Sequence, residues 1–221
     1  NWNQVCNGGL VAGALAVAET DPELAIRTIR QAVATMPKAL RSYEPDGAWG
    51  EGPGYWNYAT SYTVFALAAL DTALGTDFGL SEQPGLAQAG YFPLLATGPT
   101  GLHFNFADAA EDSRAGPMPC LFWLARRYGN AAFAAAEREF ISRGGSSALD
   151  MIWYRAAQDE QDGPRAGQTM LPLDKLFGGS VEIAVFRGAW GDPNALFVAA
   201  KAGYNQCNHA HLDVGNFVLD A

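Results

Sequence analysis

The sequence has little positive charge and no long apolar run. It has 14 Lys and Arg residues and 23 Asp and Glu residues, which gives a formal net charge of −9. The pI is about 4.7. Nucleic acids and anionic membranes are normally bound by a basic face, so neither is expected as a partner. No apolar stretch reaches the ~20 residues that a membrane-spanning helix needs. An acidic substrate held in a local pocket stays compatible with this composition.

Cysteine and histidine are also scarce, with 3 of each. Cys6, Cys120 and Cys207 form no CxxC pair, and any disulfide scheme leaves one of them over. We therefore expect buried free thiols. The sequence opens on Asn1 rather than Met and stops at Ala221 within an apolar alternation. This predicts an internal fragment or a trimmed chain.

The first two thirds of the chain have the pattern of helices. Asp21 is a good N-cap and Pro22 a good first helical residue, and the apolar positions that follow recur at steps of three and four. Pro37 is expected to bend or interrupt this helix. Further helices are predicted over 60–75, 119–129, 130–145 and 146–156. Their succession without strands suggests an α/α array.

The pattern changes to short strands from about Leu173 onward. "VEIAVFRG", "LFVAAKAG" and "GNFVLDA" are separated by turn residues, as in an antiparallel sheet. We expect a linker near 155–170. The sequence thus predicts a multidomain α+β protein, with a helical domain over 1–160 and the start of a β domain over 170–221.

The segment "HAHLD" holds two of the histidines. On a strand, His209 and His211 would lie on one face, as in a half-site for zinc. Asp213 would share that face and could bind an imidazole as a supporting partner. A structural or surface role for the pair is the alternative.

A second cluster, "PDGAWGEGPGYWNYATSY", combines glycine and proline with aromatic residues. We interpret it as an irregular loop, which either lines a carbohydrate groove or packs onto the helical core. Asp46 and Glu51 could form the carboxylate pair of a glycoside hydrolase. Glu51 could equally brace the loop.

Two other stretches are rich in polar side chains. "NWNQVCNGG" offers the amides of Asn1, Asn3 and Asn7, although Asn is also simply a good N-cap. "GLHFNFADAAED" carries His103 and Asp108 in a loop. A lone histidine such as His103 more often has a packing or hydrogen-bonding role.

Four motifs in order, "NWNQVCNGG", "EGPGYWNYATSY", "FNFADA" and "HAHLDVGNFVLDA", resemble the heparinase II/III family of polysaccharide lyases, including its oligoalginate lyase branches. The resemblance covers nearly the whole chain. It implies an N-terminal α/α toroid, here incomplete, followed by the start of an antiparallel β-sandwich domain. A periplasmic or secreted location is favoured, and a cytoplasmic one suits a member that acts on oligosaccharides.

The resemblance also implies a chemistry, the β-elimination of uronate-containing acidic polysaccharides. Asn1 would neutralise the uronate carboxylate, and Tyr55, with Tyr58 as second choice, would be the catalytic tyrosine. His209 would be catalytic or neutralising. His211 would be a ligand of a structural zinc ion whose other ligands, an Asp and a His, lie outside this sequence.

Four further residues are candidates for substrate binding: Trp2, Glu51, Trp56 and Arg187. Trp2 stands where several family members have a histidine, which leaves the base for one uronate epimer undefined. A plain surface role is the alternative for Arg187.

Three functions compete at this stage. The leading hypothesis is a lyase that prefers alginate or its oligosaccharides to glycosaminoglycans. The second is an α/α-barrel glycoside hydrolase that uses Asp46 and Glu51. The third is a non-catalytic carbohydrate-binding protein on the same scaffold.

Overall fold

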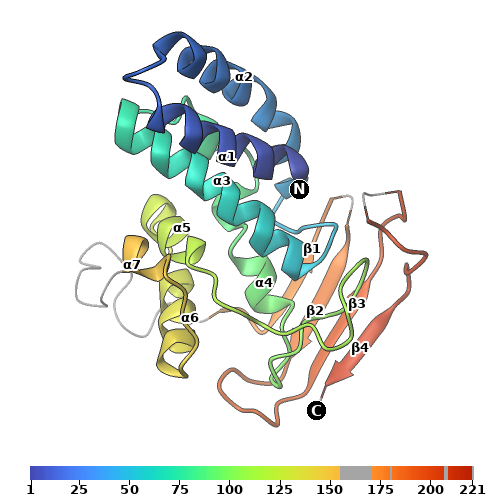
Figure 1. Ribbon diagram of the computed structural model, residues 1–221. Helices are drawn as coiled ribbons and strands as arrows, with labels where there is room; N and C mark the ends of the chain where they lie inside the picture. The colour runs from blue at the N-terminus through green and yellow to red at the C-terminus, as the bar shows by residue number, and fades with distance from the viewer. Residues whose placement is uncertain (155–170, 180, 207–208, 221) are drawn as a thin grey trace.

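The computed structural model describes residues 1–154, 171–179, 181–206 and 209–220. The predicted linker, 155–170, lies outside the described residues. Helices come first and a four-stranded antiparallel sheet follows, so the α+β class and its order along the chain are confirmed (Figure 1). No helix of the described part is long and apolar enough to cross a membrane.

Three long helices pack side by side at the N-terminal end: α1 (Trp2–Ala16), α2 (Pro22–Leu40) and α3 (Pro53–Leu74) (Figure 1). Asp21 caps α2 as predicted, since its Oδ1 accepts a hydrogen bond of 3.0 Å from the Leu24 N–H. The expected interruption at Pro37 is wrong, because α2 continues to Leu40. Pro37 removes one hydrogen bond near the helix end, while buried Met36 and Leu40 anchor that turn in the core.

Helix α3 begins at Pro53, within the segment that was predicted to be a loop and before the predicted helix start at residue 60. Gly52 adopts a left-handed backbone with φ 89°, and Pro53 at the first helical position starts the helix directly after it. Tyr55 and Trp56 therefore lie on the first turn of α3 rather than on an irregular loop. Gly75 ends α3 in the left-handed conformation, as predicted.

The remaining helices are shorter. They are α4 (Tyr91–Leu95), α5 (Cys120–Tyr128), α6 (Ala131–Ser142) and α7 (Asp150–Trp153), with single 3₁₀ turns at Arg41–Tyr43, Leu80–Glu82 and Leu86–Gln88. The predicted pairing of α5 with α6 is confirmed: the two contact each other and are joined by left-handed Gly129 and the N-cap Asn130.

The sheet has the order β1 (Asp174–Phe177), β2 (Ile183–Arg187), β3 (Phe197–Lys201) and β4 (Phe217–Asp220), with every neighbouring pair antiparallel. The alternation of buried and exposed residues gives it two distinct faces. Its inner face carries Phe177, Ile183, Val185, Phe197 and Ala199, which belong to one buried cluster with residues of α2, α3 and α5. Helices and sheet therefore share one hydrophobic core.

The cysteines only partly match the expectation of buried thiols. Cys120 is buried, and burial raises the pKa of its thiol to about 12. Cys6 is exposed on α1, contrary to the prediction, because it lies on the helix face turned away from the core. Cys207 lies outside the described residues.

Candidate functional site

A cavity of about 240 Å³ opens between the first turns of α3 and the loop that follows Phe106. It is lined by Glu51, Gly54, Tyr55, Tyr58, Asp108, Ala109, Ala110 and Ser113. Two carboxyl groups and two phenol groups thus face one small space. The cavity brings together the aromatic motif and the "FNFADA" motif, which are separated by about fifty residues in the sequence.

A third segment, the histidine-rich one around His209, reaches this cavity through Tyr55. The rings of Tyr55 and His209 stack, with centroids 4.9 Å apart and an angle of 22° between their planes. His209 comes from the connection between β3 and β4, so the sheet region meets the start of α3 here.

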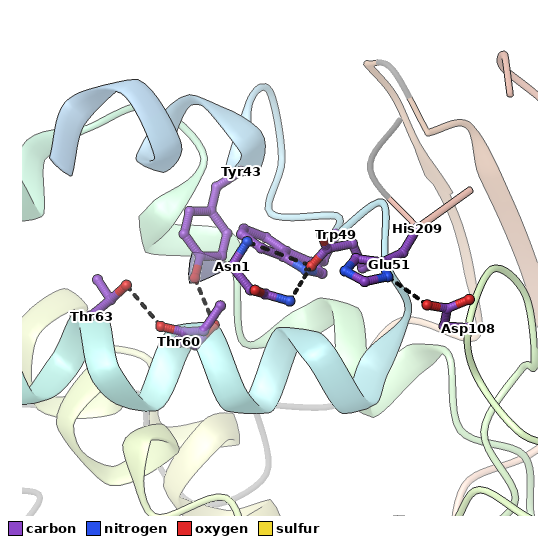
Figure 2. A network of polar contacts seen from close by, with 9 residues as sticks. Asn1, Tyr43, Trp49, Glu51, Thr60, Thr63, Asp108 and His209 are labelled. Carbon is purple, nitrogen blue, oxygen red and sulfur yellow. Dashed lines mark hydrogen bonds and ion pairs between the residues drawn. The ribbon is translucent and has the colours of Figure 1, made fainter. Parts of the chain in front are cut away.

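Asp108 holds both histidines of this connection. Its Oδ2 lies 2.5 Å from Nδ1 of His209, and its Oδ1 lies 2.8 Å from Nε2 of His211 (Figure 2 shows the His209 contact). Hydrogen bonds from His211 and His209 lower the pKa of Asp108 below its ordinary value. The carboxyl group is therefore ionised at neutral pH and accepts from both rings.

The expected strand geometry of the histidine pair is wrong. His209 and His211 lie between the end of β3 and the start of β4, and His209 has a left-handed backbone with φ 58°. The two imidazoles nevertheless converge, because they bind the two oxygens of one carboxylate.

Asp213 does not bind an imidazole, contrary to the prediction. Its Oδ2 accepts from the Ala107 N–H at 2.8 Å, and its Oδ1 forms an ion pair with buried Lys201 of β3. Burial acts to raise the pKa of Asp213, but the hydrogen bonds from Lys201 and Ala107 outweigh it and lower the pKa. Asp213 thus fixes the loop that carries Asp108 to the segment that carries His209.

Glu51 is a buried residue of the cavity lining and binds the Asn1 amide. Its Oε2 accepts from Asn1 Nδ2 at 2.9 Å and from Trp49 Nε1 at 3.2 Å (Figure 2). Asn1 occupies the N-cap position of α1, yet its side chain makes no capping hydrogen bond. The amide donates to Glu51 instead, so the capping alternative is wrong.

The other two asparagines of this motif are structural. Asn3 Nδ2 donates to the Thr35 carbonyl oxygen at 3.3 Å, and Asn7 Nδ2 donates to the Thr35 hydroxyl at 3.2 Å. Both side chains connect α1 to α2.

Two predicted substrate-binding residues are buried away from the cavity. Trp56 is fully buried, because α3 turns its side chain into the core. Arg187 lies on the inner face of the sheet, where it donates to the Thr97 carbonyl oxygen and packs over Trp190, 4.1 Å from the ring centroid. Neither side chain is part of the described cavity lining, which disfavours substrate contact for both residues.

Of the remaining candidates, Tyr58 is exposed and lines the cavity, and Trp2 is exposed on the first turn of α1. His103 is buried, and its Nδ1 lies 2.8 Å from the Thr97 hydroxyl, which confirms the packing interpretation. Asp46 contacts Lys175 at 3.4 Å and accepts from the Gly178 N–H at 3.2 Å.

Asp108 is the central residue that the sequence did not single out as part of the site. Its motif was recognised, but nothing in the spacing indicated that residue 108 would bind residues 209 and 211. A carboxylate in a loop between alanines is a weak signal without knowledge of this contact.

The described residues do not by themselves make up the expected zinc site, whose other ligands were predicted outside this sequence. Two ligands of one tetrahedral zinc lie roughly 3.3 Å apart, given bonds of about 2.0–2.1 Å. The contacts of 2.5 and 2.8 Å from Asp108 to the imidazoles are hydrogen-bond separations instead. Among the residues that the structure describes, no group of three His, Cys, Asp or Glu side chains is arranged to hold a metal ion. The assignment of His211 to zinc therefore receives no support.

Comparison with protein-family models gave no match to this chain, and comparison with curated proteins gave no significant match.

Proposed function

We propose that this chain forms part of the active site of a polysaccharide lyase that cleaves uronate-containing chains by β-elimination. One observation carries the proposal, the convergence of Asn1, Tyr55 and His209. Tyr55 lines the cavity, His209 stacks on it, and Asn1 binds Glu51 in the same cavity wall. These are the three residues to which the motif resemblance gives chemical roles.

The proposed reaction needs three kinds of groups. A base takes the proton from C5 of the uronate, and the electron pair forms the C4–C5 double bond. The bond from C4 to the glycosidic oxygen breaks, and that oxygen takes a proton from an acid. Removal of the C5 proton adds negative charge beside a carboxylate, so a hydrogen-bond donor must stabilise that carboxylate.

The residues around the cavity can fill these roles. The Tyr55 hydroxyl can protonate the leaving oxygen, and the His209 imidazole can take a proton or stabilise charge. Asn1 uses one Nδ2 hydrogen for Glu51, and its side chain is only 1 % exposed, so the amide can present the second hydrogen to the uronate carboxylate only after a movement of the cavity wall. A preorganised donor of this kind contributes roughly 10²–10³ in rate.

The charges in the cavity favour a particular class of substrate. Glu51 and Asp108 are acidic, and each is hydrogen-bonded to two side-chain nitrogens, which stabilise a negative charge on the carboxyl group. No Lys or Arg belongs to the described lining of the cavity. Sulfate groups are normally bound by basic side chains, so unsulfated uronates such as those of alginate are favoured over sulfated glycosaminoglycans.

The outer face of the sheet supports a β-sandwich as the finer description of the β domain. Leu176, Phe186, Phe217 and Leu219 are exposed on this face. Apolar side chains in this arrangement are what a second sheet covers in a sandwich. The incomplete α/α toroid of the helical part belongs to the same proposal, supported by the successive helix pairs.

The two alternatives receive less support. A hydrolase pair of Asp46 and Glu51 is disfavoured because Asp46 binds Lys175 and Gly178 and is outside the cavity lining. A protein that only binds carbohydrate would not need an ionised Asp108 to order two imidazoles beside a tyrosine.

The first test measures product formation by the full-length protein. Alginate, heparan sulfate, chondroitin and hyaluronan are supplied separately, and the near-ultraviolet absorbance of the C4–C5 double bond is followed. We expect absorbance to rise with alginate or its oligosaccharides. Reducing ends formed without this absorbance would contradict the proposal and favour a hydrolase.

Tyr55→Phe tests the assignment of the tyrosine. We expect this change to abolish unsaturated product, because the leaving oxygen loses its proton donor. Tyr62→Phe is the matched control, since Tyr62 lies on α3 but is not part of the cavity lining, and it should keep wild-type turnover. Unchanged turnover in Tyr55→Phe would transfer the role to Tyr58.

A further inference from the structure

We propose that a proton held between Glu137 of α6 and Asp150 of α7 latches α7 to the other helices, and that loss of this proton releases α7 as the pH rises. The inference goes beyond the proposed function and does not depend on it. It concerns two buried carboxyl groups that are not part of the described cavity lining.

The two carboxyl groups have matching surroundings. Glu137 is 1 % exposed and Asp150 is 6 % exposed. One oxygen of each accepts a backbone N–H: Oε1 of Glu137 from Met118 at 2.9 Å, and Oδ2 of Asp150 from Ser147 at 2.7 Å. The other oxygen of each, Oε2 of Glu137 and Oδ1 of Asp150, is enclosed and has no donor among the described residues.

One proton satisfies both of these oxygens. The side chains of Glu137 and Asp150 are hydrogen-bonded to each other. Because an ionised carboxylate only accepts hydrogen bonds, one of the two groups must carry a proton. Glu137 is that group, since burial raises its pKa to about 7 and the hydrogen bond with Asp150 acts in the same direction. Its Oε2–H therefore donates to Oδ1 of Asp150.

The other described groups near Glu137 are neutral or turned away from it. Cys120 of α5 interacts with Glu137, and burial raises the pKa of its thiol to about 12, so the thiol stays protonated. From α3, the Ser61 side chain is hydrogen-bonded to the same thiol. Arg138 follows Glu137 on α6 and lies about 100° further around the helix. Within the described part of the chain, the pH of the solution therefore decides the state of this pair.

The latch holds a helix that has few other anchors. Helix α7 has 4 residues and lies against α5 (Figure 1). Met151 and Ile152 are exposed, whereas Trp153 stacks on Phe65 of α3 with a centroid distance of 5.5 Å. The bond from Glu137 to Asp150 is thus the polar contact that joins α7 to α6.

Release follows from loss of the proton. When a base in solution takes it, the electron pair stays on Oε2, and two negative carboxylates face each other in an enclosed site. The repulsion is relieved if α7 moves away, which brings both groups to solvent. There Glu137 ionises near its ordinary pKa of 4.5. Opening therefore becomes more frequent as the pH rises from 4.5 to about 7, and it levels off above that.

Infrared difference spectroscopy of the full-length protein tests for the proton. At about pH 6, wild type should show the carbonyl band of a protonated carboxyl group that Glu137→Gln lacks. In Asp150→Asn the band should disappear at a lower pH than in wild type, because the new amide can donate to an ionised Glu137. Glu139→Gln, which removes an exposed carboxyl group of the same helix, should keep the band. Absence of the band in wild type, or an unchanged titration in Asp150→Asn, would overturn the proposal.

Hydrogen exchange tests the release of α7. The exchange of segment 146–154 is followed by mass spectrometry in wild type and in Glu137→Gln, whose amide can donate to Asp150 at every pH. The ratio of the two rates at one pH cancels the intrinsic pH dependence of exchange. The two pKa values predict that wild-type exchange gains roughly 50- to 100-fold on the variant between about pH 5 and about pH 8. A ratio that stays constant with pH would contradict the latch.

Low concentrations of urea separate release of α7 from unfolding of the whole protein. Local opening exposes little surface, so exchange of segment 146–154 should not respond to urea, whereas exchange through global unfolding accelerates. A urea response equal to that of the buried amides of α3 would show that α7 does not open alone, and the latch would be ruled out.

Discussion

At the residue scale, the buried carboxyl group of Glu137 makes stability depend on pH. Burial raises its pKa to about 7 from an ordinary value of 4.5, and the Coulomb effect of Asp150 adds to this, against the hydrogen bond of 2.9 Å from the Met118 N–H. The unfolded chain loses this proton near pH 4.5, whereas the folded chain keeps it until about pH 7. Stability therefore falls as pH rises between these values and is lowest above them.

We expect Glu137→Gln to remove this dependence. The amide oxygen can still accept from Met118, and no charge has to be buried. The variant should be more stable than wild type at pH 8, by on the order of 2 kcal/mol, and nearly equal to it below pH 4.5. Urea unfolding at both pH values measures the difference. An equal difference at both would contradict the pKa assignment.

His103 gives stability the opposite dependence on pH, since it makes the folded state less stable as the pH falls into the acid range. Burial lowers the pKa of its imidazole to about 4 from 6.5, so the unfolded chain takes up a proton before the folded chain does. Its contribution to stability is complete above pH 6.5 and is lost as pH falls toward 4. His103→Gln should flatten the thermal unfolding temperature over this range. A slope as steep as that of wild type would show that another group is responsible.

Sequence reasoning was least able to separate residues within a motif. Tyr55 and Trp56 are neighbours in "GYWNY", yet the first lines the cavity and the second is buried in the core. The rotation of α3 about its axis decides which of the two side chains faces the cavity and which faces the core. That rotation depends on where the helix begins, and the glycines and prolines around Pro53 concealed its start.

At the element scale, the contact between α1 and α3 depends on a close approach of their backbones. A Cβ atom added at Gly8 would lie 2.4 Å from the Tyr62 carbonyl oxygen, whereas one added at Gly9 would have nothing within 4 Å. Only the first glycine is therefore required by packing. This contact also sets the position of Asn1 relative to the first turns of α3.

We expect Gly8→Ala to destabilise the protein by about 1–3 kcal/mol, because the helices must separate. Gly9→Ala is the control on the same helix, and it should stabilise by up to about 1 kcal/mol, since alanine is the better helix former. Chemical denaturation of both variants checks this pair. Similar effects of both changes would show that the helices are not in close contact at Gly8.

The periodic elements themselves were well predicted. The N-cap at Asp21, the end at Gly75, the α5–α6 pair and the strands after Leu173 follow from local patterns of apolar residues and turn formers. The histidine pair lies between β3 and β4 and not on a strand, which the two-residue spacing considered for a strand could not show, because spacing alone does not reveal whether the backbone is extended.

At the scale of the whole molecule, the site exists because four segments that are distant in the sequence meet. Asp108 and His209 are separated by 101 positions, and Asn1 and Glu51 by 50. No local pattern in the sequence encodes these contacts. They follow from the core that the helices and the inner face of the sheet share, and from the pairing of Asp213 with Lys201.

Lys201→Met tests that pairing. Lys201 is 2 % exposed, so its loss leaves a largely buried Asp213 without its cation. We expect a destabilisation of roughly 2–4 kcal/mol. Lys175→Met breaks the more exposed pair with Asp46 and should cost under about 1 kcal/mol. Equal costs for the two variants would show that the Lys201 pair does not fix the loops.

The most direct measurement is the mass of the products formed from alginate oligosaccharides in heavy-oxygen water. A lyase adds no water, so the product masses should sum to the mass of the substrate and carry no heavy oxygen from the solvent. Products that have gained one water, with the label at the new reducing end, would identify hydrolysis and contradict the account.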